Sequence, residues 1–160
     1  MKKKIEILFL TLVLFAIVFP IAEAIDVKNI ERDKRINTYN NNILYVGGLE
    51  PGNYSSIQEA IDNASDGDTI FVYDDSSPYY EKLEISWKSI NLIGENKDTT
   101  IIDGMEKSNV IYVNSDNIRI SGFTIRNSSK SGANYCAGIF VYVNSDYVEI
   151  IDNNFYNNYF

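Results

Sequence analysis

The sequence predicts an all-β solenoid in which about three to four coils of short parallel strands stack behind one capping helix. Three observations predict it. From residue 69 onward the chain consists of apolar segments three to five residues long, nearly all separated by Gly, Asn, Asp or Ser. These segments recur at offsets of 28 to 30 residues, and a fixed period of this length is typical of repeat architectures. A single amphipathic helix, predicted between residues 55 and 64, precedes them.

The N-terminus carries a predicted export signal. Lys2, Lys3 and Lys4 precede an almost unbroken apolar run at 7–21, and the small-x-small pattern of a cleavage site follows at 22–24. We expect residues 1–24 to be a signal peptide cleaved after Ala24, so that the protein is secreted or held at the cell surface. An uncleaved membrane anchor is the alternative, although the apolar run is shorter than the ~20 residues of a spanning helix. Residues 25–42 are expected to be a polar linker, and 43–160 the solenoid domain.

Composition excludes several function classes. The chain has 14 basic and 22 acidic residues. Removing the three lysines and two glutamates of 1–24 leaves 11 and 20, a net charge of −9 that argues against nucleic acid as a partner. Histidine is absent, which excludes nucleophiles activated by histidine and zinc or copper sites built from it. Cys136 is the single cysteine, so no internal disulfide forms.

The first predicted elements are a strand and a helix. Residues 43–46 form a strand that ends at Gly47. Ser55 or Ser56 then caps the helix, and Gln58 or Glu59 completes a capping box. The apolar face of this helix lies at i, i+3, i+4 and i+7 and consists of Ile57, Ala60, Ile61 and Ala64. Because the rest of the chain resembles strands, this helix is expected to cover an apolar surface.

The remaining predicted elements are strands at residues 69–73, 82–86, 89–93, 100–102, 110–113, 117–120 and 123–125. One repeat contains three triplets, I-Y-V, I-R-I and F-T-I, each followed by a polar corner. Period-two alternation predicts that each triplet buries its first and third side chains. An offset of 28 places 83–85 on 111–113, and an offset of 30 places 112–116 on 142–146, where VNSD recurs. A coil cannot bury its apolar side chains alone, so stability requires stacking.

Residues 52–104 resemble the opening of right-handed parallel β-helix proteins, a group that includes pectin methylesterases, pectate-lyase-like proteins and NosD-like exported proteins. The pattern is a capping helix x-I-Q-x-A-I, then G-D-T-I, Y-x-E, I-x-L-x-G and T-x-I-D-G. It is matched here by residues 57–61, 67–70, 80–81 with Ile85, 90–94 and 100–104. The resemblance implies a right-handed parallel β-helix over about residues 45–160. It implies no single function, because this fold hosts lyases, esterases, hydrolases and adhesins.

The sequence predicts no catalytic residue. The enzymes that this chain resembles carry catalytic aspartates, an arginine and glutamines on later coils, in motifs that have no counterpart here. Copper loading, known in some NosD-like proteins, is disfavoured by the absence of histidine. The loop aspartates Asp62, Asp66, Asp68, Asp74 and Asp75 are interpreted as turn formers rather than as a paired-carboxylate glycosidase centre.

The candidate ligand-binding residues occupy outward positions of the repeat. The offset of 30 predicts that Tyr112 stacks on Tyr142 and Arg119 on Glu149. An exposed aromatic ladder suits stacking on the apolar C–H faces of sugar rings; the alternative is a set of cross-strand pairs that stabilise the sheet.

Other candidate sites lie at the corners. Asp116 and Asp146 stack one coil apart and are weak candidates for calcium ligands, the alternative being corner solvation; no other cofactor is implied. Sequons for N-glycosylation occur at Asn53, Asn63 and Asn127.

The leading hypothesis is a secreted or cell-surface, non-catalytic β-helix protein that contacts carbohydrate or acts as an adhesin. The alternative is a polysaccharide-active enzyme of lyase, esterase or hydrolase type, or a truncated remnant or subunit of one. Residues 153–160 show no capping pattern. We therefore expect either a longer parent protein or pairing of this end with another chain, including self-association.

Overall fold

The computed structural model describes residues 41–130 and 136–159. These belong to one compact unit, residues 40–160. The predicted signal peptide and nearly all of the predicted linker lie outside the described residues. Within the described part of the chain, no helix is long and apolar enough to span a membrane.

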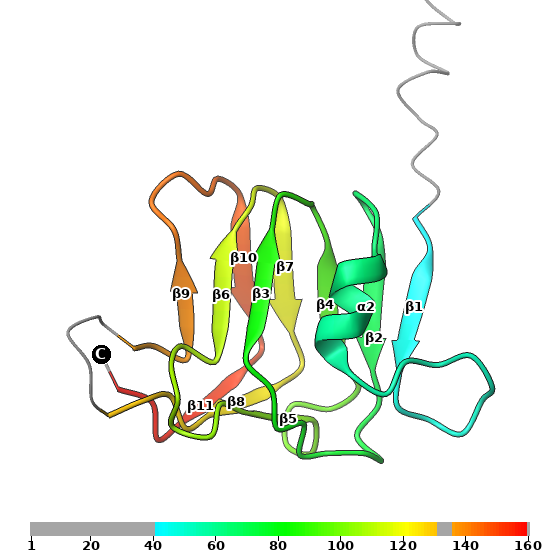
Figure 1. Ribbon diagram of the computed structural model, residues 1–160, viewed down its shortest axis with the longest axis horizontal. Helices are drawn as coiled ribbons and strands as arrows, with labels where there is room; N and C mark the ends of the chain where they lie inside the picture. The colour runs from blue at the N-terminus through cyan, green and yellow to red at the C-terminus, as the bar shows by residue number, and fades with distance from the viewer. Residues whose placement is uncertain (1–40, 131–135, 160) are drawn as a thin grey trace, which may run out of the picture. The chain divides into compact units, whose positions relative to one another are not determined.

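Three parallel sheets build the fold (Figure 1). The strands of the five-stranded sheet are, in spatial order, β1 (Ile43–Val46), β2 (Thr69–Val72), β4 (Asn91–Gly94), β7 (Ile118–Ser121) and β10 (Val148–Ile151). The second sheet contains β3 (Leu83–Ser86), β6 (Ile111–Asn114) and β9 (Ile139–Val141), and the third β5 (Ile101–Asp103), β8 (Thr124–Arg126) and β11 (Asn154–Tyr156). The single described helix is α2 (Ile57–Asn63).

Each coil contributes one strand to each sheet. We call β3-β4-β5 the first coil, β6-β7-β8 the second and β9-β10-β11 the third, while α2 and β2 form a partial coil before them. Strands of neighbouring coils pair in parallel throughout. The predicted right-handed parallel β-helix of about three to four coils with an N-terminal capping helix is confirmed, and the bounds of the predicted strands are correct to within two residues.

The second coil shows the predicted alternation most clearly. The first and third side chains of its triplets point inward and are at most 1% exposed; these are Ile111, Val113, Ile118, Ile120, Phe123 and Ile125. The middle residues, Tyr112, Arg119 and Thr124, are partly exposed. The core is therefore a column of aliphatic side chains supplied by every coil.

A pair of glycines allows two coils to approach closely at one corner. Gly94 and Gly122 lie opposite each other, and a Cβ built on Gly94 would lie 2.2 Å from the carbonyl oxygen of Gly122. Gly122 also has a φ of +83°, which residues with a side chain rarely adopt. No larger residue fits at Gly94 unless the backbone shifts.

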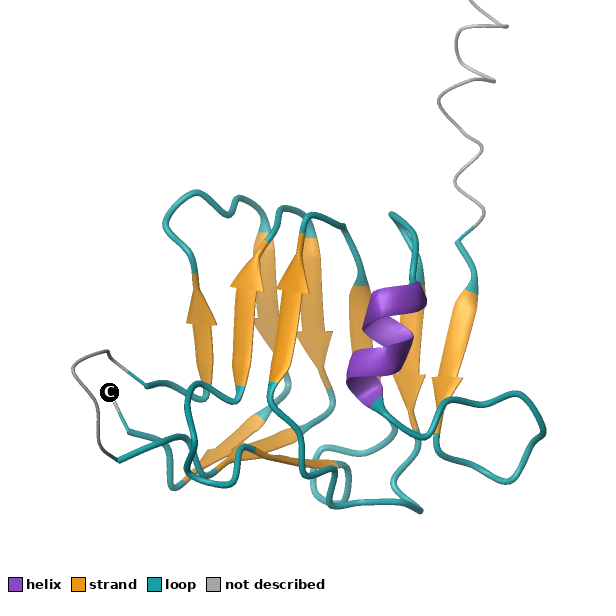
Figure 2. Ribbon diagram, viewed as in Figure 1, coloured by secondary structure: helices purple, strands orange, loops and turns teal. Residues whose placement is uncertain are grey.

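Helix α2 closes the solenoid beside β3, at one end of the β3-β6-β9 sheet (Figure 2). Its Ile57, Ala60 and Ile61 side chains are buried, as predicted. The side chain of Gln58 acts as a substitute strand, because its Nε2 donates to the carbonyl of Glu84 (3.1 Å) and its Oε1 accepts from the N–H of Glu84 (2.8 Å). The free edge of β3 is thus partly hydrogen-bonded by one amide.

Two side chains that flank β3 hold the ends of α2. The Glu81 carboxylate accepts hydrogen bonds from the N–H groups of Ile57 and Gln58, both at 2.9 Å, and from the Ser56 hydroxyl at 2.8 Å. Ser56 is the N-cap, as predicted, and accepts from the N–H of Glu59. At the other end the Lys88 ammonium donates to the carbonyls of residues 61, 62 and 64 at 2.8–3.0 Å. The negative charge of Glu81 at the N-terminus of the helix and the positive charge of Lys88 at its C-terminus both complement the helix dipole.

The predicted register of the third coil is wrong at one corner. β9 pairs with β6 at an offset of 28, so that Phe140 lies opposite Tyr112 and Val141 opposite Val113. β10 and β11 pair at an offset of 30, as predicted. The change of offset from 28 to 30 leaves two extra residues in the third coil, and they lie at 142–144, where three residues face Asn114 alone. Val143, which was predicted to point inward, is 84% exposed.

The pattern alone could not distinguish the two registers, since both place aliphatic residues inward. Two contacts accompany the observed register. The rings of Tyr112 and Phe140 stack with centroids 5.8 Å apart, and the Asn109 side chain accepts a hydrogen bond from the N–H of Ala137 at 2.7 Å. The predicted stacking of Tyr112 on Tyr142 is replaced by stacking on Phe140.

Candidate functional site

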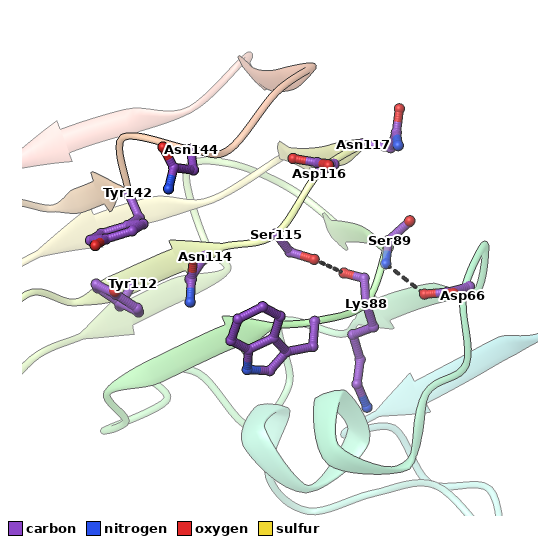
Figure 3. Close-up of a pocket in the computed structure, with 11 residues that line it drawn as sticks. Asp66, Lys88, Ser89, Tyr112, Asn114, Ser115, Asp116, Asn117, Tyr142 and Asn144 are labelled. Atoms are coloured by element: carbon purple, nitrogen blue, oxygen red, sulfur yellow. Dashed lines mark hydrogen bonds between the residues drawn. The ribbon is translucent and has the colours of Figure 1, made fainter.

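An open groove of about 690 Å³ lies at the corner where β3, β6 and β9 end and the chain turns toward β4, β7 and β10 (Figure 3). We call it the corner groove. It is lined by Asp66, Trp87, Lys88, Ser89, Tyr112, Asn114, Ser115, Asp116, Asn117, Tyr142 and Asn144. The lining includes both VNSD corners, so the repeat found in the sequence forms part of one surface.

Aromatic side chains from three successive coils lie in this groove. Trp87 follows β3 and is 86% exposed. Tyr112 is the second residue of β6, and its stacking on Phe140 fixes the plane of its ring. Tyr142 follows β9 and is 41% exposed. Figure 3 shows Tyr112 and Tyr142 projecting from neighbouring coils on the same side. The structure thus places both predicted tyrosines in one groove without stacking them on each other.

Trp87 adopts an unfavourable backbone conformation. Its φ is +64°, in the left-handed region where a bulky residue is a genuine outlier and costs about 1–3 kcal/mol. Most other described corner residues with positive φ are asparagine, aspartate or glycine, among them Asn117, Asn127 and Asp152. Since the Trp87 side chain is almost fully exposed, burial offsets little of this cost. Sequence reasoning missed Trp87, although it is the one tryptophan of the chain and lies directly after a predicted strand.

Amides provide the polar part of the groove. Asn114 and Asn144 come from the two VNSD corners, and Asn117 starts the turn into β7. Within the described residues their side-chain amides donate and accept no hydrogen bond. Each such amide has two donor hydrogens and an acceptor oxygen, so three amides are available to a bound ligand.

The charged groups of the groove are used by the fold. Asp66 accepts a hydrogen bond from the N–H of Ser89 at 2.9 Å, and Asp116 accepts one from the N–H of Asp146 at 2.8 Å. The Lys88 ammonium points to α2, where it holds the helix carbonyls (Figure 3). The Ser115 hydroxyl donates to the carbonyl of Lys88 at 2.8 Å. Two carboxylates therefore border the groove with no ammonium facing them.

The other predicted ligand-binding residues lie elsewhere. Arg119 and Glu149 stand opposite each other on β7 and β10, as predicted, and form an ion pair at 2.9 Å. Their side chains are 43% and 61% exposed, and exposed pairs of this kind contribute at most about 1 kcal/mol. They neutralise each other outside the corner groove.

The hydrogen bond from the Asp146 N–H to the Asp116 carboxylate links two coils at a corner, a role that differs both from calcium binding and from the corner solvation weighed against it. Across residues 41–130 and 136–159, no three His, Cys, Asp or Glu side chains form a group able to hold a metal ion. Of the loop aspartates predicted as turn formers, Asp62 and Asp68 accept local hydrogen bonds, from the Gln58 amide and the N–H of Ser65, whereas Asp75 accepts from the N–H of Gly48, 27 residues away.

The amides of the three sequon asparagines already donate hydrogen bonds. Asn53 donates to the carbonyl of Gly47 at 2.6 Å and Asn63 to that of Glu59 at 2.8 Å. Asn127 donates to the buried carboxylate of Asp103 at 2.9 Å. Asn63 is the most exposed of the three and remains the best predicted glycan acceptor.

Asp103 is an ionised group of the interior that sequence reasoning did not single out. It is 4% exposed and accepts hydrogen bonds from Arg126 Nε at 2.8 Å and from the N–H of Met105 at 2.9 Å. Burial raises the pKa of this carboxyl, but the hydrogen bonds from Met105, Asn127 and Arg126, together with the Arg126 charge, outweigh burial and hold the pKa below its usual value. The group is structural, since it joins the first and second coils.

A second aromatic cluster lies on the outward side of β1 and β2. The rings of Tyr45, Phe71 and Tyr73 have centroid separations of 5.2–6.2 Å. The rings contact one another and include no tryptophan. This cluster is therefore a well-packed surface patch. It is a second aromatic surface, besides the corner groove, on which a ligand could stack.

No family model matches this chain, and no curated protein matches it either. Among solved structures, the chain is similar to a pectin methylesterase crystallised in complex with a hexasaccharide, with a TM-score of 0.56 and 20% sequence identity. The similarity covers 71% of this chain and 42% of that protein. This likeness shows the fold, and it confirms the predicted resemblance to pectin-methylesterase-like right-handed parallel β-helices.

Proposed function

We propose that this protein binds polysaccharide in the corner groove and does not process it. The observation that carries the proposal is Trp87, a single tryptophan held exposed and in a left-handed conformation. Strain of this kind clusters at binding and catalytic sites; the exposed Tyr147 shares it, with a φ of +56°, but lies outside the groove. A flat apolar ring that projects into solvent is what stacking on a sugar face requires.

The rest of the lining supports the same ligand class. Tyr112 and Tyr142 add two further aromatic side chains, and the Asn114, Asn117 and Asn144 amides add donors and acceptors. Sites with several aromatic surfaces and a few polar groups are typical of small-ligand recognition. A protein of the same fold was crystallised with a hexasaccharide, which adds support from outside this chain.

Turnover is disfavoured by the groove's chemistry. Glycoside hydrolysis needs one carboxylic acid and one carboxylate on either side of the scissile bond. Here Asp66 and Asp116 are each held by a backbone N–H at a corner, and the sequence offers no histidine as a base. The rival function is a polysaccharide-active enzyme or a subunit of one.

The N-terminal basic and apolar segment supports an exported location. Residues 2–4 and 7–21 have the composition of a secretory signal, and an extracellular or surface location would bring the groove into contact with polysaccharide. The proposed role is therefore that of a secreted or surface-held carbohydrate-binding protein.

The test uses Trp87 as a built-in reporter, because it is the one tryptophan in the chain. Residues 25–160 are titrated with pectic, xylan and mannan hexasaccharides while indole emission and acrylamide quenching are recorded. Binding is expected to shift the emission to shorter wavelength and to protect the indole from quencher. In calorimetry, Tyr142→Ala is expected to weaken binding about 3- to 10-fold, the value of one aromatic contact.

Tyr80→Ala is the matched control, since Tyr80 is 61% exposed and lies outside the groove; this variant is expected to bind normally. A polysaccharide that binds while Trp87 emission stays unchanged would remove the groove from the proposal. Release of reducing ends or methanol that a single aspartate substitution abolishes would establish the enzymatic alternative instead.

A further inference from the structure

We infer that the corner groove selects an uncharged glycan and discriminates against polyuronates and other polyanionic chains. This inference rests on the proposed function, and it concerns the substrate class of the same groove. Three features carry it: the charges on the lining, the availability of the amides, and the direction in which the aromatic side chains are arranged.

The charges that border the groove are negative. Asp66 and Asp116 keep their carboxylates at its edge, each with one oxygen bound to a backbone N–H. Lys88 lines the groove with its stem, but its ammonium is bound to three carbonyls of α2. Among the described residues, a uronate carboxylate entering the groove would meet two like charges and no available cation.

The field of the whole molecule has the same sign. The chain has a formal net charge of −8 at pH 7, which repels a polyanion before contact and does so most strongly at low ionic strength. Recognition of carboxylates in proteins relies on arginine or lysine. Both arginines among the described residues are already paired, Arg119 with Glu149 and Arg126 with Asp103.

The polar groups that are available match hydroxyl groups. Asn114, Asn117 and Asn144 each present both donors and an acceptor, and a sugar hydroxyl can use either. A carboxylate can only accept, so it can pair with the donor hydrogens of these amides but not with their oxygens.

The aromatic side chains come from successive coils but not from one row, because Tyr112 pairs with Glu84, three residues before Trp87, and Tyr142 lies just past Val141, the partner of Val113. Trp87, Tyr112 and Tyr142 belong to the first, second and third coils. Neighbouring strands are about 4.8 Å apart, so the three rings extend over roughly 10 Å across the coils. This length fits a short stretch of a glycan chain that lies across the strand ends, with successive sugars on successive coils.

The test compares two hexasaccharides that differ in charge, xylohexaose and hexagalacturonate, by calorimetry with EDTA present. The neutral sugar is expected to bind with an affinity that salt hardly changes. The uronate is expected to bind roughly tenfold more weakly at low salt, with the difference narrowing as salt screens the repulsion.

Two variants separate local charge from net charge. Asp116→Asn removes a carboxylate at the groove and keeps an oxygen for the Asp146 N–H, whereas Glu50→Gln removes one charge at an exposed residue outside it. Asp116→Asn is expected to reduce the ratio of the xylohexaose affinity to the hexagalacturonate affinity at least threefold. Glu50→Gln is expected to leave that ratio unchanged.

The possible outcomes separate the inference from the proposed function. If hexagalacturonate binds as tightly as the neutral sugar, or more tightly, and Trp87 reports it, the charge inference is overturned while glycan binding stands. If no glycan of either kind binds, both are overturned. A ratio that responds equally to Asp116→Asn and Glu50→Gln would also overturn selection by the groove itself.

Discussion

At the scale of single residues, the molecule separates side chains that stabilise the fold from those that do not. Asp103 is buried and fully hydrogen-bonded, with Arg126, Asn127 and the Met105 N–H as partners. Trp87 is exposed and strained. The first residue is explained by the stability of two adjacent coils, whereas stability does not explain the second, and this contrast motivates the proposed glycan binding.

Asp103→Asn tests the structural side of this contrast. The variant loses a charge-assisted hydrogen bond to Arg126 and presents an amide to donors, so the free energy of unfolding should fall by about 2–3 kcal/mol at pH 7. Because the pKa of folded Asp103 lies below that of the unfolded chain, its contribution is present above about pH 4 and is lost as pH falls through the folded value.

Urea unfolding at pH 7 and at pH 3 checks this prediction, with Glu50→Gln as an exposed control. The difference between wild type and Asp103→Asn is expected to shrink at the lower pH. A difference that stays constant across this range would show that the variant acts through packing rather than through the ionised carboxylate.

At the scale of elements, α2 depends on the first coil for its existence. Seven residues are too few for a stable isolated helix. Glu81 and Lys88, on either side of β3, bind the free N–H and carbonyl groups at its two ends, and Gln58 hydrogen-bonds the β3 edge in return. Several residues that carry the resemblance to β-helix enzymes thus serve this cap, which is why the resemblance predicts fold and not activity.

Glu81→Ala should therefore loosen the cap. Three hydrogen bonds at the helix N-terminus are lost, so the free energy of unfolding is expected to fall by about 1–3 kcal/mol. Relative to the wild type, amide hydrogen exchange is expected to accelerate more in α2 than in β7. Glu50→Ala is the control, since Glu50 is exposed and lies outside the helix and its caps. Unchanged exchange in α2 would mean that Ser56 and the apolar face hold the helix without Glu81.

The elements also show what the sequence could predict. Triplets such as I-R-I at 118–120 have one inward pattern and a single offset to each neighbouring coil, 28 to β4 and 30 to β10, so their strands and partners follow directly. The corner at 142–144 does not, because two registers bury aliphatic residues equally well and only contacts with Phe140 and Ala137 distinguish them. The sequence did not predict that Glu81 and Lys88 hold the two ends of α2, because their hydrogen-bond partners lie 23–27 residues away along the chain.

At the scale of the whole molecule, the corner groove is a product of stacking. Its aromatic side chains come from three coils, and no single repeat contains more than one of them. The repeat predicted that Tyr112 and Tyr142 share a side of the solenoid, but it could not predict the groove, which depends on the expanded corner after β9. Trp87 was missed because it lies outside the repeated triplets.

Glycan binding at the corner groove is tested most directly by chemical-shift mapping of ¹⁵N-labelled protein with a bound neutral oligosaccharide. Shifts are expected at the Trp87 indole N–H, the Asn114, Asn117 and Asn144 amides, and the backbone of residues 86–89 and 142–144. Shifts concentrated instead at Tyr45, Phe71 and Tyr73, with the Trp87 indole unmoved, would contradict it.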